Sequence, residues 1–181
     1  MNVFIHTYTP LRDRDAERSK QKLLANKLLE YALRECWGLN LTEQKIGKSP
    51  KGKPYFENID VKFSKSHTDG IVAVAVSDKE VGVDCQTVRP VSSKLISRVC
   101  NDTEMEFVEA SADIDKAFTL VWAKKEALVK LSGEGLAVSL KDIDTAKVTS
   151  FLSTDSYAIA AVDEIGSKAE FIFVSEEEIG A

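Results

Sequence analysis

The strongest constraint on the fold is a segment from Asp115 to Leu131 that is apolar at most of its positions. Its pattern predicts a helix, and Gly133-Glu134-Gly135 supplies the end of that helix, because glycine readily adopts the left-handed conformation found there. A helix with so few polar positions has to be largely buried. Lys125, Glu126 and Lys130 interrupt this apolar surface and therefore need partners.

The other periodic segments predict an α+β fold. A polar stretch at residues 11–20 leads into a helix whose apolar residues return every three or four positions, from Leu23 until Gly38. Two short helices are predicted, one from Ser92 or Ser93 to Val99 and one that begins at Asn101 or Asp102. Strands are predicted at residues 2–8, 61–63, 71–76, 80–86, 146–152, 157–162 and 170–174. The breaker-rich residues 47–54 predict an irregular linker.

This order of elements suggests two α+β lobes packed side by side, with residues 1–78 as the N-terminal lobe and residues 79–181 as the C-terminal lobe. A net charge of −5 argues against general affinity for nucleic acid, whose phosphates bind surplus Lys and Arg. No secretion signal is evident, and no apolar run approaches the roughly 20 residues that span a bilayer. The three cysteines lack a metal-type spacing and predict reduced thiols in a cytoplasmic protein.

The predicted strand at residues 80–86 carries an acidic side chain that could hold a metal ion. Side chains alternate along a strand, so Asp84 and Gln86 point to one face while Val83 and Cys85 point into a core. Gly82 leaves room for another group to come close. A carboxylate at this position suits a hard cation such as Mg²⁺, and the alternative is a solvated aspartate at a sheet edge.

The charged positions of the apolar helix point to similar chemistry. Glu126 and Lys130 are four residues apart and therefore meet on one helix face. A simple salt bridge between them is one explanation. However, an exposed pair contributes only about 0.3–0.5 kcal/mol, too little to explain charges placed among Phe118, Trp122 and Val129. A metal ion and phosphate groups would supply the missing partners.

Two further segments carry weaker signals for phosphate binding. Ser66 and His67 end a predicted strand, where the histidine could bind a phosphate or could be an ordinary surface residue. Neighbouring strand residues point to opposite faces, so direct activation of Ser66 by His67 is not expected. Gly52-Lys53-Pro54 is, by itself, a turn with a basic residue.

The order and spacing of these motifs resemble the 4′-phosphopantetheinyl transferases. A Gly-Lys-Pro turn, a strand ending in Ser-His, a Val-Gly-Val-Asp strand and a Trp-x-x-Lys-Glu-Ala-x-x-Lys helix follow one another between residues 23 and 140. The resemblance is to the larger, single-chain Sfp-type branch. It implies two similar α/β lobes packed with pseudo-twofold symmetry, here with a shortened first lobe.

The resemblance also implies residue roles. Asp84 and Glu126 would bind Mg²⁺, Glu126 would act as general base, and Lys130 would assist catalysis. Gln86 stands where many relatives have a second acid; its carbonyl oxygen could complete the metal site, or a water molecule could take that place, and we expect weaker metal binding. The implied contacts with coenzyme A are Lys22 (or Lys20) at the 3′-phosphate, Gly52, Lys53 and Pro54 at the adenine, Ser66 and His67 at the phosphates, and Lys125 and Lys130 at the pyrophosphate.

The implied reaction transfers the 4′-phosphopantetheine arm of coenzyme A to a serine of an apo acyl or peptidyl carrier protein and releases 3′,5′-ADP. The site should be a basic pocket in an acidic protein. The carrier should dock on an apolar patch around residues 105–108 and Leu131 of a monomer. Two alternatives stay open: a protein that binds coenzyme A or a carrier without turnover, and another Mg²⁺-dependent phosphoryl transferase or hydrolase that uses the same two acids.

Overall fold

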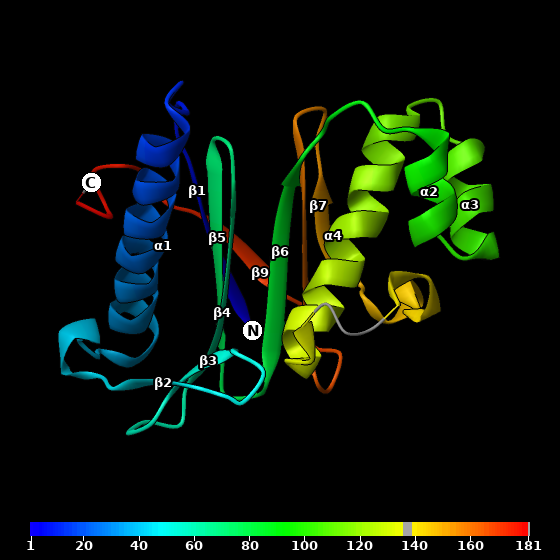
Figure 1. Ribbon diagram of the computed structural model, residues 1–181. Helices are drawn as coiled ribbons and strands as arrows, with labels where there is room; N and C mark the ends of the chain where they lie inside the picture. Colours follow the sequence, from blue (N-terminus) through cyan, green and yellow to red (C-terminus); the bar gives the residue numbers. More distant parts are fainter. Residues whose placement is uncertain (136–138, 181) are drawn as a thin grey trace.

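The structure is a computed structural model that describes residues 1–135 and 139–180, and it has the expected α+β class (Figure 1). The α-helices of these ranges are α1 (Arg14–Trp37), α2 (Ser93–Val99), α3 (Asp102–Glu109) and α4 (Ile114–Ser132). The strands are β1 (Asn2–Thr7), β2 (Ile46–Lys48), β3 (Pro54–Phe56), β4 (Lys62–Thr68), β5 (Ile71–Ser77), β6 (Val81–Thr87), β7 (Ser150–Ser153), β8 (Tyr157–Asp163) and β9 (Glu170–Phe173). No helix in the described ranges is both long and apolar enough to cross a membrane.

Two sheets form the centre of the fold. The first has the strand order β4-β5-β1-β9, in which β1 runs antiparallel to β5 and parallel to β9. The second is antiparallel, with the order β6-β8-β7. Strand β9 lies in the predicted C-terminal lobe by sequence, but it pairs with β1 and so belongs to the first sheet. The division at residue 78 and the pseudo-twofold symmetry stay predictions.

The layers run from α1 through the two sheets to α4 (Figure 1). One face of the first sheet packs on α1, and this core includes Phe4, Leu24, Leu28, Phe63, Val72 and Val74. Its other face packs on the second sheet through small residues such as Ala73, Ala75 and Val83. The far face of the second sheet packs on α4 through Ala123, Ala127, Ala158 and Ala160. Alanines at this last interface let α4 lie close to the sheet.

Helix α1 begins nine residues before the predicted Leu23, at Arg14. The Asp13 side chain caps its first turn by accepting a hydrogen bond from the backbone N–H of Ala16. The polar turns that follow are held by a long-range contact, because the Tyr8 hydroxyl donates to the buried carboxylate of Glu17 at 2.6 Å. The expectation of a polar lead-in without helix at residues 11–20 was therefore wrong.

Two other expectations need correction. Residues 47–54 were expected to be irregular; residues 49–53 are, but the two ends of the range belong to β2 and β3, which pair antiparallel as a short hairpin. The strand expected at residues 146–152 begins later, at Ser150, and a 3₁₀ turn occupies Thr145–Lys147. The strands concerned are only 3 or 4 residues long, too short to show a reliable alternating pattern.

The two sheets meet along β4 and β6, and serine side chains bridge them. The Ser64 hydroxyl accepts a hydrogen bond from Val83 N at 3.1 Å, and the Ser66 hydroxyl accepts one from Cys85 N at 3.2 Å. These contacts satisfy backbone donors of β6 that would otherwise be buried without partners. We call this boundary between β4 and β6 the seam; the candidate site lies beside it.

Candidate active site

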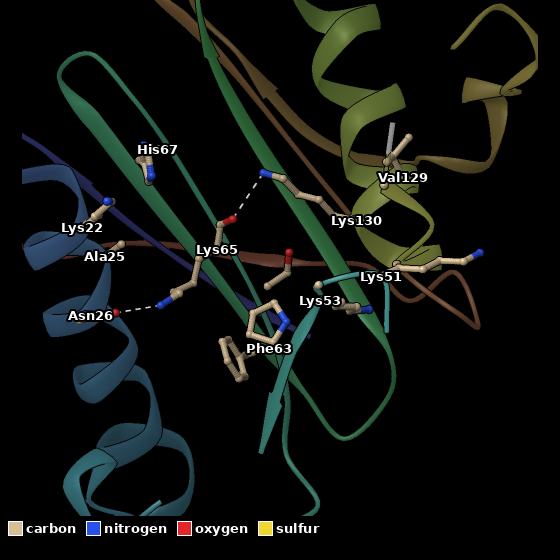
Figure 2. A pocket seen from close by; sticks show the side chains of 15 residues that line it. Lys22, Ala25, Asn26, Lys51, Lys53, Phe63, Lys65, His67, Val129 and Lys130 are labelled. Atoms are coloured by element: carbon tan, nitrogen blue, oxygen red, sulfur yellow. Dashed lines mark hydrogen bonds between the residues drawn. The ribbon is translucent and has the colours of Figure 1, made fainter. Parts of the chain in front are cut away.

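A pocket of about 560 Å³ lies beside the seam, between α1 and α4 (Figure 2). Its walls come from α1, the turn before β3, strand β4 and the end of α4. The lining residues are Lys22, Ala25, Asn26, Lys51, Gly52, Lys53, Pro54, Phe63, Ser64, Lys65, His67, Val129, Lys130, Gly133 and Gly135. Five of them are lysines, so the pocket is basic although the whole chain carries a net charge of −5. Such a pocket is suited to phosphate groups.

Asp84 sits on β6 at the edge of this pocket, with only 3% of its surface exposed. Its Oδ1 atom accepts hydrogen bonds from Lys130 Nζ and from the Ser66 hydroxyl, each at 2.7 Å. Its Oδ2 atom accepts one from Gln86 Nε2 at 2.8 Å. The carboxylate is thus held on three sides by side chains from β4, β6 and α4.

Glu126 faces the same place from α4. Burial raises the pKa of its carboxyl, and the negative charge of Asp84 raises it further, while Lys130 acts in the opposite sense. The two carboxylates are therefore close enough to repel each other. Lys130 pairs with Asp84 at 2.7 Å, and in the described part of the chain it forms no ion pair with Glu126. The simple explanation, a salt bridge between Glu126 and Lys130 within the helix, is therefore wrong: Lys130 pairs with Asp84 on β6.

The close approach of β6 and α4 explains why the two carboxylates meet. A Cβ atom added to Gly82 would lie 2.0 Å from the carbonyl oxygen of Ala127. Only glycine allows the helix to come this near the strand. Asp84 follows Gly82 by two residues on the same face of the strand, and Glu126 adjoins Ala127 on the helix.

These residues fit a divalent cation. Two carboxylates that repel each other, with the side-chain amide of Gln86 beside them, offer hard oxygen ligands. No cluster of three or more His, Cys, Asp or Glu suited to a metal occurs among the described residues. The protein would thus supply two carboxylates at most, which is common for Mg²⁺ sites completed by phosphate oxygens and water.

Most of the residues implied for coenzyme A line the pocket, but two do not. Lys22, Gly52, Lys53, Pro54, His67 and Lys130 are in its walls. The Ser66 hydroxyl instead donates a hydrogen bond to Asp84 and accepts one from the backbone N–H of Cys85. Lys125 is 0% exposed and forms an ion pair with Glu104 at 2.7 Å. It belongs to the packing of α4, so we leave it out of the coenzyme A contacts.

The turn at residues 51–54 is tied to the end of α4. Lys53 Nζ donates to the carboxylate of Glu80 at 2.7 Å and to the carbonyl oxygen of Leu131 at 2.8 Å. Lys51 lies 3.4 Å from Glu134. The charge of Lys53 is therefore used to fix the turn, whereas Lys20, the second choice for the 3′-phosphate, donates to the carbonyl oxygen of Thr9.

Asn26, Lys51 and Lys65 are polar residues of the pocket that were not expected from the sequence. Lys65 Nζ donates to Asn26 Oδ1 at 2.8 Å across the gap between β4 and α1 (Figure 2). The signal was present in the alternation of β4, because Lys65 shares a strand face with Phe63 and His67. A phosphate site at His67 therefore implies that Lys65, on the same strand face, lies in that site as well.

A second hollow lies at the other end of the Asp84–Gln86 stretch. It is smaller, about 270 Å³, and is lined by Gln86, Thr87, Arg89, Pro90, Val91, Leu95, Phe118, Thr119 and Trp122. The residues expected to receive a carrier lie elsewhere: Phe107 borders a different hollow beside α3, and Leu131 borders one beside the turn at residues 51–54.

Lysines around a pocket, with the Asp84 carboxylate paired to one of them, place the protein among those whose site suits a ligand that carries phosphate groups. The sequence profile of the 4′-phosphopantetheinyl transferase superfamily matches residues 80–171, a stretch that holds both β6 and α4. It covers half of the chain, and the protein therefore belongs to this superfamily.

Several curated relatives agree with this family. A 4′-phosphopantetheinyl transferase of Bacillus subtilis is 27% identical over 68% of this chain and 57% of its own length. The transferase psf-1 of Bacillus pumilus is 27% identical over 77% of this chain and 59% of its own. The L-aminoadipate-semialdehyde dehydrogenase-phosphopantetheinyl transferase of Saccharomyces cerevisiae is 29% identical over 71% and 52%. The chain thus spans between half and three fifths of these relatives.

Proposed function

We propose that the protein transfers the 4′-phosphopantetheine arm of coenzyme A to a serine of an apo acyl or peptidyl carrier protein and releases 3′,5′-ADP. The observation that carries this proposal is the lysine-lined pocket beside Asp84, whose carboxylate pairs with Lys130 at 2.7 Å and whose negative charge raises the pKa of Glu126 on α4. The printed names of the relatives supply the reaction class.

The metal expected for this reaction is Mg²⁺, held by Asp84 and Glu126 with the side-chain carbonyl of Gln86 as a third ligand. When bound, it would offset the negative charge that develops on the diphosphate as the phosphoryl bond breaks. The Gln86 amide now directs its NH₂ group at Asp84, so it has to rotate before its oxygen can serve as a ligand. Ser66 keeps its bond to Asp84 and holds that carboxylate in place.

Glu126 is suited to accept the proton of the carrier serine. Burial and the charge of Asp84 raise the pKa of Glu126, which makes the ionised carboxylate a stronger base than an exposed glutamate. Lys130 is one helical turn further along and faces the same pocket. Its ammonium group would bind the diphosphate oxygens while it remains paired with Asp84.

The two hollows lie at either end of the boundary between β6 and α4, and we assign one substrate to each. We place the nucleotide of coenzyme A in the 560 Å³ pocket, against the lysines and the Gly52-Lys53-Pro54 turn. The carrier serine then approaches from the side of the second hollow, whose walls include Val91, Leu95 and Trp122. The apolar lining of this hollow suits a helix or the pantetheine arm better than a phosphate.

The proposal is tested by following the mass of an apo carrier protein incubated with the protein, Mg²⁺ and coenzyme A. We expect the mass of one phosphopantetheine to be added. Asp84→Asn and Glu126→Gln should each slow the transfer about 100-fold or more, because each removes a charge needed at the reacting phosphate. Glu109→Gln, on an exposed face of α3, is the matched control and should leave the rate unchanged.

The alternatives give different results in the same assay. Retention of coenzyme A without any labelling of several apo carriers would favour a binding protein. Release of 3′,5′-ADP in the absence of a carrier would favour a hydrolase. Undiminished transfer by Asp84→Asn or Glu126→Gln would refute the roles given to these two residues.

A further inference from the structure

The turn at residues 51–54 is a wall between the candidate pocket and another large hollow. This hollow has a volume of about 460 Å³ and lies on the far side of the turn, beside Glu80 and Tyr55. Much of the lining that it shares with the candidate pocket comes from the turn, since both include Lys51, Lys53 and Pro54. The position of the turn therefore sets the shape of the candidate pocket.

The turn is well ordered within itself, but the hairpin that carries it is short. Lys53 N donates to Ser49 Oγ at 3.0 Å, and Ser49 N donates to the carbonyl oxygen of Lys53 at 2.9 Å. Strands β2 and β3 have only three residues each, and an isolated two-stranded hairpin is marginally stable at best. The turn would move as a unit unless contacts with the rest of the fold hold it.

The Lys53 side chain makes these contacts on two sides (Figure 2). Its ammonium donates at 2.7 Å to Glu80, the residue directly before β6, and at 2.8 Å to Leu131 O in the last turn of α4. A cation is favourable at the C-terminal end of a helix. Its stem lies on the same helix end, because a Cβ atom added to Gly133 would be 3.2 Å from Lys53 Cδ. We call the two hydrogen bonds of the Lys53 ammonium the latch.

A second link between the turn and α4 is weaker than the latch. Lys51 Nζ lies 3.4 Å from the Glu134 carboxylate, and the two side chains are 58% and 49% exposed. An ion pair this exposed contributes little. The Lys53 side chain is only 17% exposed, so its pair with Glu80 is screened less by water.

We propose that Glu80 is a positioning residue for coenzyme A: it holds Lys53 in the latch and thereby fixes the turn as a wall of the candidate pocket. This rests on the proposed function, which places the nucleotide against that turn. Glu80 lines the 460 Å³ hollow and not the candidate pocket, so it acts through Lys53 and not by touching the ligand. Lys53, in turn, acts through the protein atoms it binds and not through its charge on the phosphates.

The test combines calorimetric titration of coenzyme A, with Mg²⁺ and without a carrier, with KM and kcat for coenzyme A in carrier labelling. Glu80→Ala should weaken binding and raise KM about fivefold, as expected for loss of a partly exposed ion pair. It should leave kcat within about twofold, because Asp84 and Glu126 are held by other contacts. Glu80→Gln should have a smaller effect, since its amide oxygen can still accept the hydrogen bond of Lys53.

A double-mutant cycle tests whether Glu80 acts through Lys53. Lys53→Met should weaken binding at least as much as Glu80→Ala, because it removes both hydrogen bonds of the latch. The double variant should bind coenzyme A no more weakly than Lys53→Met alone. Glu134→Gln is the matched control: it removes the exposed partner of Lys51 at the same helix end and should leave the affinity within about twofold.

Several results would overturn the positioning role while the proposed transfer stands. Unchanged or tighter binding by Glu80→Ala would show that Lys53 is not needed in the latch, and additive losses in the double variant would show that the two residues act separately. A fall of kcat and of the melting temperature in step with the affinity would reveal a merely structural role. If Glu80→Ala weakened binding but the wild type labelled no carrier, the positioning role would stand and the transfer would fall. A wild type that does not bind coenzyme A would overturn both.

Discussion

Replacing Gly82 with alanine should separate the two elements that carry the candidate site. The added Cβ atom would lie 2.0 Å from Ala127 O and 2.6 Å from Leu131 N, both backbone atoms of α4. No side-chain rotation can relieve such contacts, and Cβ atoms essentially never approach other atoms closer than 3.0 Å. Helix α4 would therefore have to move away from β6 by about 1 Å.

A shift of this size has two consequences. Overpacking a core costs about 1–3 kcal/mol, and we expect the upper end, about 3 kcal/mol, because the neighbouring Ala123 and Ala127 are fully buried. The same shift moves Glu126 and Lys130 away from Asp84. A misplacement of about 1 Å is enough to slow a reaction about 100-fold.

Urea unfolding measures the first effect, as a lower midpoint at an unchanged slope. Carrier labelling, corrected for the folded fraction, measures the second. Gly47→Ala is the control: its Cβ atom would meet the ends of the Glu57 and Tyr55 side chains, at 2.6 and 2.9 Å, and these can move. It should cost less than about 1 kcal/mol. If Gly82→Ala were as stable and as active as Gly47→Ala, the close approach of α4 and β6 would not hold the site together.

Two further predictions concern buried charges. Lys125→Met should lower the free energy of unfolding by about 3–5 kcal/mol in a denaturation experiment, because it leaves the Glu104 carboxylate buried without its cation. The folded variant should bind coenzyme A with unchanged affinity. A large loss of affinity would show that Lys125 contacts coenzyme A after all. The raised pKa of Glu126 means that the folded state binds a proton at this carboxyl more tightly than the unfolded chain does. The metal-free protein should therefore lose stability as the pH rises from about 4 through the raised pKa. The loss should be about 1 kcal/mol or less, because the carboxylate is only half-buried. Glu126→Gln in a chelator should not show this loss, and parallel pH profiles of the two proteins would contradict the assignment.

The elements that could be predicted closely are those whose buried face shows as a regular apolar pattern within a short stretch of sequence. The strand expected at residues 80–86 is β6, Val81–Thr87, and the helix expected at residues 115–131 is α4, Ile114–Ser132. Both are bounded by residues with strong local preferences, and both bury regular sets of apolar side chains. The capping box of α3, in which Asn101 and Glu104 exchange hydrogen bonds, is equally local.

The early start of α1 could not be read in the same way. Its first two turns are polar, and they are helical in part because Tyr8, which lies outside the helix, donates a hydrogen bond to the buried Glu17. Only Asp13, a good N-cap residue, signalled the true beginning. Long-range hydrogen bonds of this kind leave no periodic trace in the sequence.

For the site, helix geometry could have separated the two neighbouring residues Lys125 and Glu126. Successive helical residues point about 100° apart, so they cannot both face one phosphate group. The structure directs Lys125 to the carbonyl oxygens of Leu140 and Ile143, at 2.8 and 2.9 Å. What no sequence pattern could supply is the pairing of Lys130 with Asp84, which depends on how α4 lies on β6.

The pairing of β9 with β1 bears on how the chain folds as it is made. His6 and Val174 are 168 residues apart, yet the ring of His6 lies 2.9 Å from the carbonyl oxygen of Val174. A ribosome adds about 5–20 residues per second, so the 168 residues between them delay the parallel neighbour of β1 by about 8 to 34 seconds. Until then one edge of β1 is open to pairing with other chains, which makes nascent and C-terminally shortened forms of this protein prone to aggregate.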